Sequence, residues 1–222
     1  MKIVPAPLEE SLEGVKTQLT RLVPYFDRFS IDILDGTILP AKTVPIRQIV
    51  EYLESNASHF QGKTFDFDLM STQYEDALDQ IEKLAQTVTV GNIVILKDAL
   101  QSSQFPTRNG LVIGLSIDYQ DYIEDLAHEY NLDTIPVIQI MTIHAGAQGL
   151  SFIPDSLNKI DQLRVAGYRS KIYIDGGVNN DSLPIILSQK NLPDFACVGS
   201  FLTKASDEEL KERVEYLHSI EK

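Results

Sequence analysis

The chain alternates short apolar runs with amphipathic helical stretches from end to end, and this alternation is what most constrains its fold. Eight β-like runs recur, each followed by a candidate helix: "KIVPA", "RFSIDIL", "TFDFDLM", "NIVILK", "GLVIGLSI", "PVIQIMTI", "SKIYIDGG" and "DFACVGS". Strands that alternate with helices form a parallel sheet with crossover helices. Eight such units in 222 residues predict one (β/α)8 TIM barrel domain spanning residues 1–222. A doubly wound open sheet is the alternative.

Amino-acid composition limits which classes of binding partner we expect. The net charge is −13 with a pI near 4.6, so the chain lacks the surplus of Lys and Arg that neutralises phosphates. We therefore expect no nucleic-acid partner and no binding to an anionic membrane. The first residues lack a signal-peptide core and no apolar run is long enough to span a bilayer, which predicts a cytoplasmic protein. The single cysteine, Cys197, excludes a disulfide framework and is expected to be a packed core thiol.

Polar residues and glycines gather where the predicted strands end. They are Asp32 and Asp35, Asp66 and Asp68, Met141 to His144, Asp175 with Gly176 and Gly177, and Gly199 with Ser200. In a TIM barrel the active site lies at the carboxyl ends of the strands. The shared position of these residues therefore predicts an active site there.

Alternation of side chains along a strand indicates which of these residues converge. If one face of each strand points into the barrel, Asp32, Asp68 and Asp175 meet near its mouth. The methionines Met70 and Met141 would then border them. On the same faces lie Ser30 with Asp32, Asp66 with Asp68, Gln139 with Met141, and Tyr173 with Asp175.

Structural roles are the alternative for each of these residues. Strand-end aspartates often cap the following helix or accept loop hydrogen bonds. We expect Asp35 to order the turn at Gly36, and Asp66 to lie deeper and pair with a core polar group. Methionines are often core filler.

The motifs resemble those of the ribulose-phosphate 3-epimerase family. "SIDILDGTILPAKTV" is similar to its His-x-Asp-x-Met-Asp-Gly-x-Phe-x-Pro-Asn strand, and "FDFDLM" to its Asp-x-His-Leu-Met strand. "IMTIHAGAQGLSFIPDSLNKIDQLR" resembles the family's Met-Ser-Val-x-Pro-Gly-Phe-Gly-Gly-Gln-x-Phe-Ile-Pro loop and helix. "IYIDGGVNNDS" and "ACVGSFL" are similar to its last two strands. These matches cover roughly residues 28–203.

This resemblance implies a reaction and residues for it. Family members interconvert D-ribulose 5-phosphate and D-xylulose 5-phosphate by moving a proton at C3 through an enediolate. Asp32 and Asp175 match the two catalytic aspartates, which are also metal ligands. Met70 and Met141 match two of three methionines that flank the intermediate, and Leu34 replaces the third.

Departures from the family pattern concern the metal ligands above all. Ser30 replaces the first metal-binding histidine and Asp68 replaces the second. His144, Ala145 and Gln148 also depart from the family loop.

The resemblance implies a divalent metal, Mg, Mn, Fe or Zn, with Asp32, Asp68 and Asp175 as its ligands in this chain. Such an oxygen-rich set suits magnesium or manganese better than zinc. Without a metal, three nearby carboxylates repel one another, and at least one stays protonated near neutral pH. His144 is the nearest candidate for a replacement electrophile, and a loop hydrogen-bonding role is its alternative.

Glycine-rich loops after the last three strands favour a phosphate site, because glycines let backbone amides approach a phosphate closely. Loops after the seventh and eighth strands commonly cradle phosphate in this barrel. Simple turns are the alternative. The candidates are Gly146, Gly149, Gly176, Gly177, Gly199 and Ser200. An amide cradle would let an acidic protein bind a phosphorylated sugar.

Three hypotheses stay open. The first is the epimerase, the second a relative acting on another sugar phosphate, and the third a non-catalytic sugar-phosphate binder. The Asp-x-Lys-x-x-Asp strand of related decarboxylase and hexulose-phosphate synthase barrels has no counterpart here. The sequence leaves the oligomeric state open, a homo-oligomer included.

Overall fold

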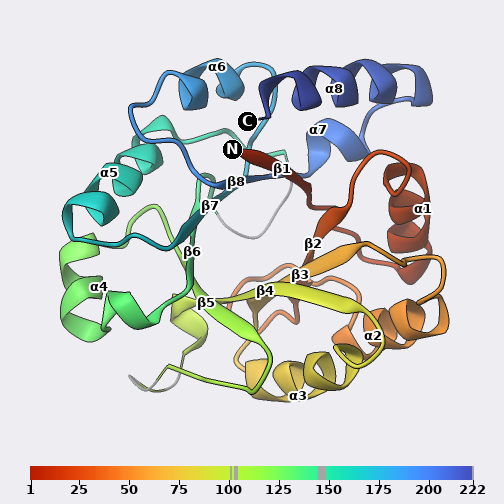
Figure 1. Cartoon of the computed structure of the whole chain (residues 1–222), viewed down its shortest axis with the longest axis horizontal. Coiled ribbons are helices and arrows are strands. Elements are labelled where there is room, and N and C mark those ends of the chain that lie inside the picture. The colour runs from red at the N-terminus through yellow and green to blue at the C-terminus, as the bar shows by residue number, and fades with distance from the viewer. Residues whose placement is uncertain (101, 103–104, 145–148, 222) are drawn as a thin grey trace.

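A computed structural model describes residues 1–100, 102, 105–144 and 149–221. Eight parallel strands form one sheet in the order β1-β8-β7-β6-β5-β4-β3-β2 (Figure 1). The strands are β1 (Lys2–Pro5), β2 (Arg28–Leu34), β3 (Thr64–Met70), β4 (Thr89–Leu96), β5 (Val112–Ile117), β6 (Val137–Met141), β7 (Lys171–Asp175) and β8 (Phe195–Val198). The two ends of the sheet, β1 and β2, come into contact, so the barrel is nearly closed. The predicted TIM barrel is confirmed.

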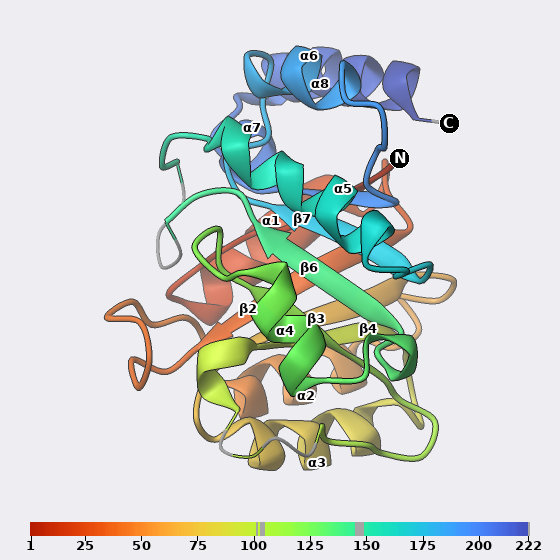
Figure 2. The same cartoon turned by 90° about the vertical axis from the view of Figure 1, so that its left-hand side faces the viewer.

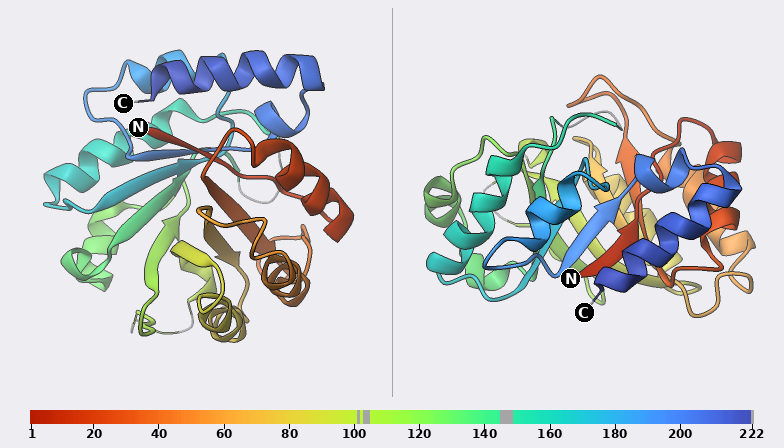
Figure 3. Two further views of the ribbon diagram at one scale, coloured as in Figure 1. Left: turned by 45° about the vertical axis from the view of Figure 1, so that its right-hand side comes forward. Right: turned by 90° about the horizontal axis from the view of Figure 1, so that it is seen from above.

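Helices cover the outside of the sheet (Figures 1 and 3). They are α1 (Leu12–Leu22), α2 (Ile46–Ser55), α3 (Tyr74–Leu84), α4 (Ile123–Glu129), α5 (Asn158–Val165), α6 (Ser182–Leu187), α7 (Ser200–Thr203) and α8 (Asp207–Ile220). Short 3-10 turns lie at Lys97–Ala99, Leu132–Thr134 and Pro154–Leu157. In the described residues, the fourth strand is thus followed by a 3-10 turn in place of an α-helix.

The helix after β3 begins later than the sequence indicates. Ser71 and Thr72 are natural N-cap residues, but α3 starts at Tyr74 and Gln73 occupies the N-cap position. Ser71 Oγ accepts a hydrogen bond from Gln73 N at 2.9 Å and donates one to Asp35 Oδ2 at 2.5 Å. Ser71 therefore does not cap α3, because its hydroxyl joins the ends of β2 and β3 instead.

Two apolar clusters make up the core. The larger fills the layer between the sheet and the helices, with residues such as Phe65, Phe67 and Leu78. The smaller cluster consists of Val4, Ala6, Val94, Val137, Tyr173 and Cys197. It takes side chains from β1, β4, β6, β7 and β8, on the face opposite that of the larger core, and so fills the inside of the barrel. Cys197 is buried, as expected.

The two termini lie side by side at the same edge of the molecule (Figures 1 and 2). Ile3 N in β1 donates a hydrogen bond to Glu221 Oε1, just after α8, at 2.8 Å. This contact joins the first strand to the last helix. No helix in the described part of the chain has both the length and the apolar character needed to cross a bilayer.

Candidate active site at the mouth of the barrel

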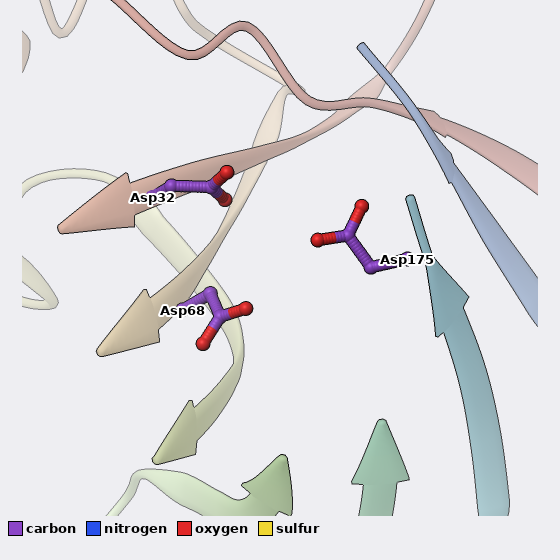
Figure 4. A group of neighbouring side chains, drawn as sticks. All are labelled: Asp32, Asp68 and Asp175. Carbon is purple, nitrogen blue, oxygen red and sulfur yellow. The ribbon is translucent and has the colours of Figure 1, made fainter. Parts of the chain in front are cut away.

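Three aspartates meet at the carboxyl ends of their strands. Asp32 comes from β2, Asp68 from β3 and Asp175 from β7, and Figure 4 shows their carboxylates pointing toward one another. One oxygen of each lies within 4.8 Å of the others. Asp32 and Asp68 are paired residues of the adjacent strands β2 and β3, so the register of these strands places them together. Asp175 comes from β7, which lies toward the opposite end of the strand order.

Burial and mutual repulsion determine the electrostatics of this cluster. Asp32 is 8% exposed and Asp68 is fully buried. Burial, followed by the Asp175 and Asp68 charges, raises the pKa of Asp32 well above its usual value. Burial and Asp175 likewise raise the pKa of Asp68, which a hydrogen bond from Gln139 partly opposes. Burial raises the pKa of Asp175 to about 7. Without a cation, the three groups therefore share protons near neutral pH.

A divalent cation fits the donor atoms of the cluster. In the described part of the chain, Asp32 Oδ1 and Asp68 Oδ1 are buried without a hydrogen-bond partner. A buried carboxylate oxygen left unpaired is costly, and a shared cation or proton removes that cost. Three carboxylates without a described histidine beside them form a hard oxygen set, which is suited to Mg²⁺ or Mn²⁺.

A pocket opens above the aspartates and collects most of the predicted site residues. Those lining it are Asp32, Asp175, Met70, Met141, Gly149, Gly176, Gly177, Gly199 and Ser200, together with Ala6, Leu8, Leu34, Ile143 and Val178. The glycines come from the segments after β6, β7 and β8. The rim of the pocket thus combines backbone from three loops with carboxylates at its base.

Two of these glycines are required by the backbone itself. Gly176 and Gly177 have φ values of +112° and +68°, which side-chain-bearing residues rarely adopt. A Cβ on Gly176 would lie 2.4 Å from Ile143 Cγ1, and one on Gly177 would lie 3.0 Å from the Phe152 backbone. Both glycines therefore permit a close approach of the β6 and β7 loops at the rim.

Other predicted residues lie elsewhere. His144 is exposed, packs edge-on against Tyr119 at 4.8 Å between ring centroids, and is not among the residues that line the pocket. Gly146 lies outside the described residues. Asp35 accepts a hydrogen bond from Thr37 N at 2.9 Å, so it orders the turn as expected. Asp66 forms a salt bridge with Arg28, so it pairs with a polar group as expected.

The sequence indicated no specific role for two polar residues that support the site. Gln139 Nε2 donates to Asp68 Oδ2 at 2.5 Å, and its position on the Met141 face was the only signal for it. Thr142 N donates to the Asp175 carbonyl at 2.7 Å, and its hydroxyl donates to the Gly176 carbonyl at 2.5 Å. Thr142 thereby ties the end of β6 to the end of β7.

Comparisons with known proteins find a family model and relatives that match most of the chain. The model of the ribulose-phosphate 3 epimerase family matches residues 3–200. Ribulose-phosphate 3-epimerase of Schizosaccharomyces pombe is 21% identical over 180 residues, covering 80% of this chain and 77% of the relative. The cytoplasmic isoform of the enzyme from Oryza sativa subsp. japonica is 22% identical over 190 residues, covering 84% and 81%.

Solved structures agree on the fold. A mutant tryptophan synthase α-subunit from Pyrococcus furiosus superposes with a TM-score of 0.67 at 12% identity, covering 99% of this chain and 98% of that one. At this identity the likeness concerns the barrel alone.

Proposed function

This chain belongs to the ribulose-phosphate 3-epimerase family, and on that premise we propose that it interconverts D-ribulose 5-phosphate and D-xylulose 5-phosphate. The observation that carries the proposal is the meeting of Asp32 and Asp175 from β2 and β7 at the base of one pocket (Figure 4). Two carboxyl groups on either side of a bound sugar can remove the C3 proton from one face and return it to the other. The enediolate forms between these two transfers.

The raised pKa values support this acid–base role. Efficient proton transfer needs groups whose pKa lies near the working pH, and burial brings the pKa of Asp175 to about 7. Repulsion within the cluster favours states in which one carboxyl is protonated while another is ionised. One aspartate would then act as the base while the other acts as the acid, and reversing these roles runs the reaction backward.

Asp32, Asp68 and Asp175 would also hold a divalent cation, as the unpaired buried oxygens of Asp32 and Asp68 indicate. A bound cation supplies Lewis-acid stabilisation of the negative charge that develops on the substrate oxygens. The chain's own part is to place three carboxylates around one point and to keep them away from bulk water.

The opposite end of the substrate is a phosphate, and the glycine-rich rim is its proposed site. Gly149, Gly176, Gly177, Gly199 and Ser200 all line the pocket, where main-chain amides can bind an anion without a basic side chain. Loops after the last strands of such barrels commonly serve this purpose. Met70 and Met141 border the space between the carboxylates and this rim. A cytoplasmic location stays a prediction. The name of the rice relative describes that protein as a cytoplasmic isoform.

Solvent exchange at C3 tests the proposal. The protein is incubated with ribulose 5-phosphate in deuterated water, with and without Mn²⁺, and the sugar is analysed by NMR. We expect deuterium at C3 and formation of xylulose 5-phosphate. An absence of deuterium in both conditions would reject the epimerase.

Two other results would support the alternative functions. Phosphate-ester binding without exchange indicates the non-catalytic binder. Exchange with another sugar phosphate, but not with ribulose 5-phosphate, indicates a relative with a changed substrate. The replacement of both family histidines, by Ser30 and Asp68, is the observation that keeps these alternatives open.

A further inference from the structure

Gln139 is a buried amide inside the barrel that no part of the proposed reaction uses. It lies on β6, is 2% exposed, and stands in register with Ser116 on β5 and Tyr173 on β7. Burial of a primary amide is unfavourable unless its donors and acceptor find partners. The partners of Gln139 therefore indicate why an amide occupies this position inside the barrel.

One of its contacts is much closer than the rest. Gln139 Nε2 lies 2.5 Å from Asp68 Oδ2, whereas Ser116 Oγ is 3.5 Å away and Met141 Sδ is 3.8 Å away. Gln139 Oε1 accepts a long contact, 4.0 Å, from Cys197 Sγ. The Asp68 contact is much shorter than the contacts with Ser116 and Met141, so it determines the orientation of the amide.

The two carboxylate oxygens of Asp68 have different surroundings. Oδ2 is held by Gln139, while Oδ1 is buried and has no hydrogen-bond partner among the residues that the structure describes. Figure 4 shows one Asp68 oxygen directed toward Asp32 and Asp175 and the other directed away from them. A carboxylate anchored through one oxygen presents the other in a fixed direction. Asp32 Oδ1, the other unpaired buried oxygen, belongs to the same cluster.

We propose that Gln139 is a positioning residue, which holds Asp68 so that its free oxygen completes a divalent-cation site with Asp32 and Asp175. The inference rests on the cation site of the proposed function and adds to it the residue that orients its most deeply buried ligand. Hydrogen-bond partners of metal ligands fix ligand orientation, and their loss typically lowers metal affinity by about 10- to 100-fold.

The test is a calorimetric titration of the whole protein with Mn²⁺ in the absence of any sugar. Gln139→Met keeps the volume of the side chain but removes its donor. We expect its dissociation constant for Mn²⁺ to rise about tenfold or more. Gln139→Asn keeps the amide but shortens its reach, and we expect the same loss, which guards against misfolding of the first variant. Ser116→Ala is the matched control, and it should bind Mn²⁺ within about twofold of wild type because its contact lies at 3.5 Å.

A double-mutant cycle separates positioning from general loosening of the barrel. In an Asp68→Asn background, Gln139→Met should cause little further loss of Mn²⁺ affinity, because the carboxylate that it orients is gone. Losses that add in full would contradict the proposal. So would a Gln139→Met protein that binds Mn²⁺ as tightly as wild type, or a wild-type protein that binds none.

The titration is independent of the epimerase assay. Mn²⁺ binding that depends on Gln139, found together with no exchange at C3, would reject the proposed function and support the positioning role. Exchange at C3 without any Mn²⁺ binding would do the reverse.

Discussion

Buried aspartates have opposite surroundings at the two ends of the barrel interior. Asp66 and Asp68 are two residues apart on β3, share its inward face, and are both buried. At the lower end, both oxygens of Asp66 are paired with Arg28 at 2.7 Å, and Asn92 N donates to it at 2.7 Å. At the mouth, Asp68 faces two further carboxylates, and one of its oxygens has no partner in the described residues.

This difference is the one we expect between a structural carboxylate and the carboxylates of the proposed site. Arg28 also lies over the Phe195 ring, 4.9 Å from its centroid, and Tyr173 OH donates to Asp66 at 3.3 Å, so the lower end forms a satisfied network. The mouth contains the unsatisfied charge that a substrate, proton or cation would use. Folded proteins retain such unsatisfied groups mainly where function requires them.

The largest expected effect comes from removing a carboxylate at the mouth. Asp175→Asn should lower the rate of deuterium incorporation at C3 by about a thousandfold, because a positioned acid or base typically contributes 10²–10⁴-fold. Full activity in this variant, measured by NMR in deuterated water, would refute the two-base assignment. Asp66→Asn is the control at the other end, and its folded form should keep activity within a few-fold of wild type.

The lower end should respond in stability and not in chemistry. Arg28→Met leaves the Asp66 charge buried and unpaired, which we expect to lower the free energy of unfolding by about 3 kcal/mol. That value is at the low end of the usual range because the Arg28 side chain is 28% exposed. Urea denaturation measures the loss. The double variant with Asp66→Asn should recover part of it, and a loss just as large in the double variant would show that the charge is not the cause.

The pH dependence of stability tests the charge cluster at the mouth. Because the pKa of Asp175 is raised from 3.8 to about 7, the folded state binds more protons than the unfolded state between these values. Stability of the metal-free protein attributable to this group therefore falls as the pH rises through that window, by on the order of 2 kcal/mol since the cluster shares protons.

Asp175→Asn isolates this contribution. Its melting temperature should match that of wild type near pH 4 and exceed it increasingly toward pH 7 and above. Saturating Mn²⁺ should remove the difference by stabilising wild type. Parallel melting curves across this range in the metal-free proteins would contradict the raised pKa.

The smallest expected effect compares glycines at the two ends. Gly176→Ala places a Cβ against Ile143 and retains a φ of +112°, whereas Gly62→Ala, before β3, meets nothing within 4 Å at a φ of +79°. We expect both to destabilise the protein, with Gly176→Ala costing about 1 kcal/mol more because of overpacking. Equal decreases in the free energy of unfolding of the two variants, measured by thermal unfolding, would mean that the rim accommodates the added methyl group.

Much of the fold could be predicted, because local patterns determine it. Alternating apolar runs and helical stretches specified eight strands, and the placement of Asp32, Asp68 and Asp175 followed from side-chain alternation in β2, β3 and β7. Helix boundaries were less predictable where a capping residue has a second use, as Ser71 shows by hydrogen-bonding Asp35.

What the sequence by itself determined is therefore the barrel and the strand ends at which its acidic residues stand. Only the tertiary structure decided that Asp66 is neutralised by Arg28, 38 residues away, and that Asp68 is held by Gln139, 71 residues away. The physical reason is that the role of a buried charge depends on its partners across the barrel. Arg28 reaches Asp66 from the neighbouring strand β2, whereas Gln139 on β6 reaches Asp68 on β3 because the sheet curls into a barrel, which no local pattern specifies.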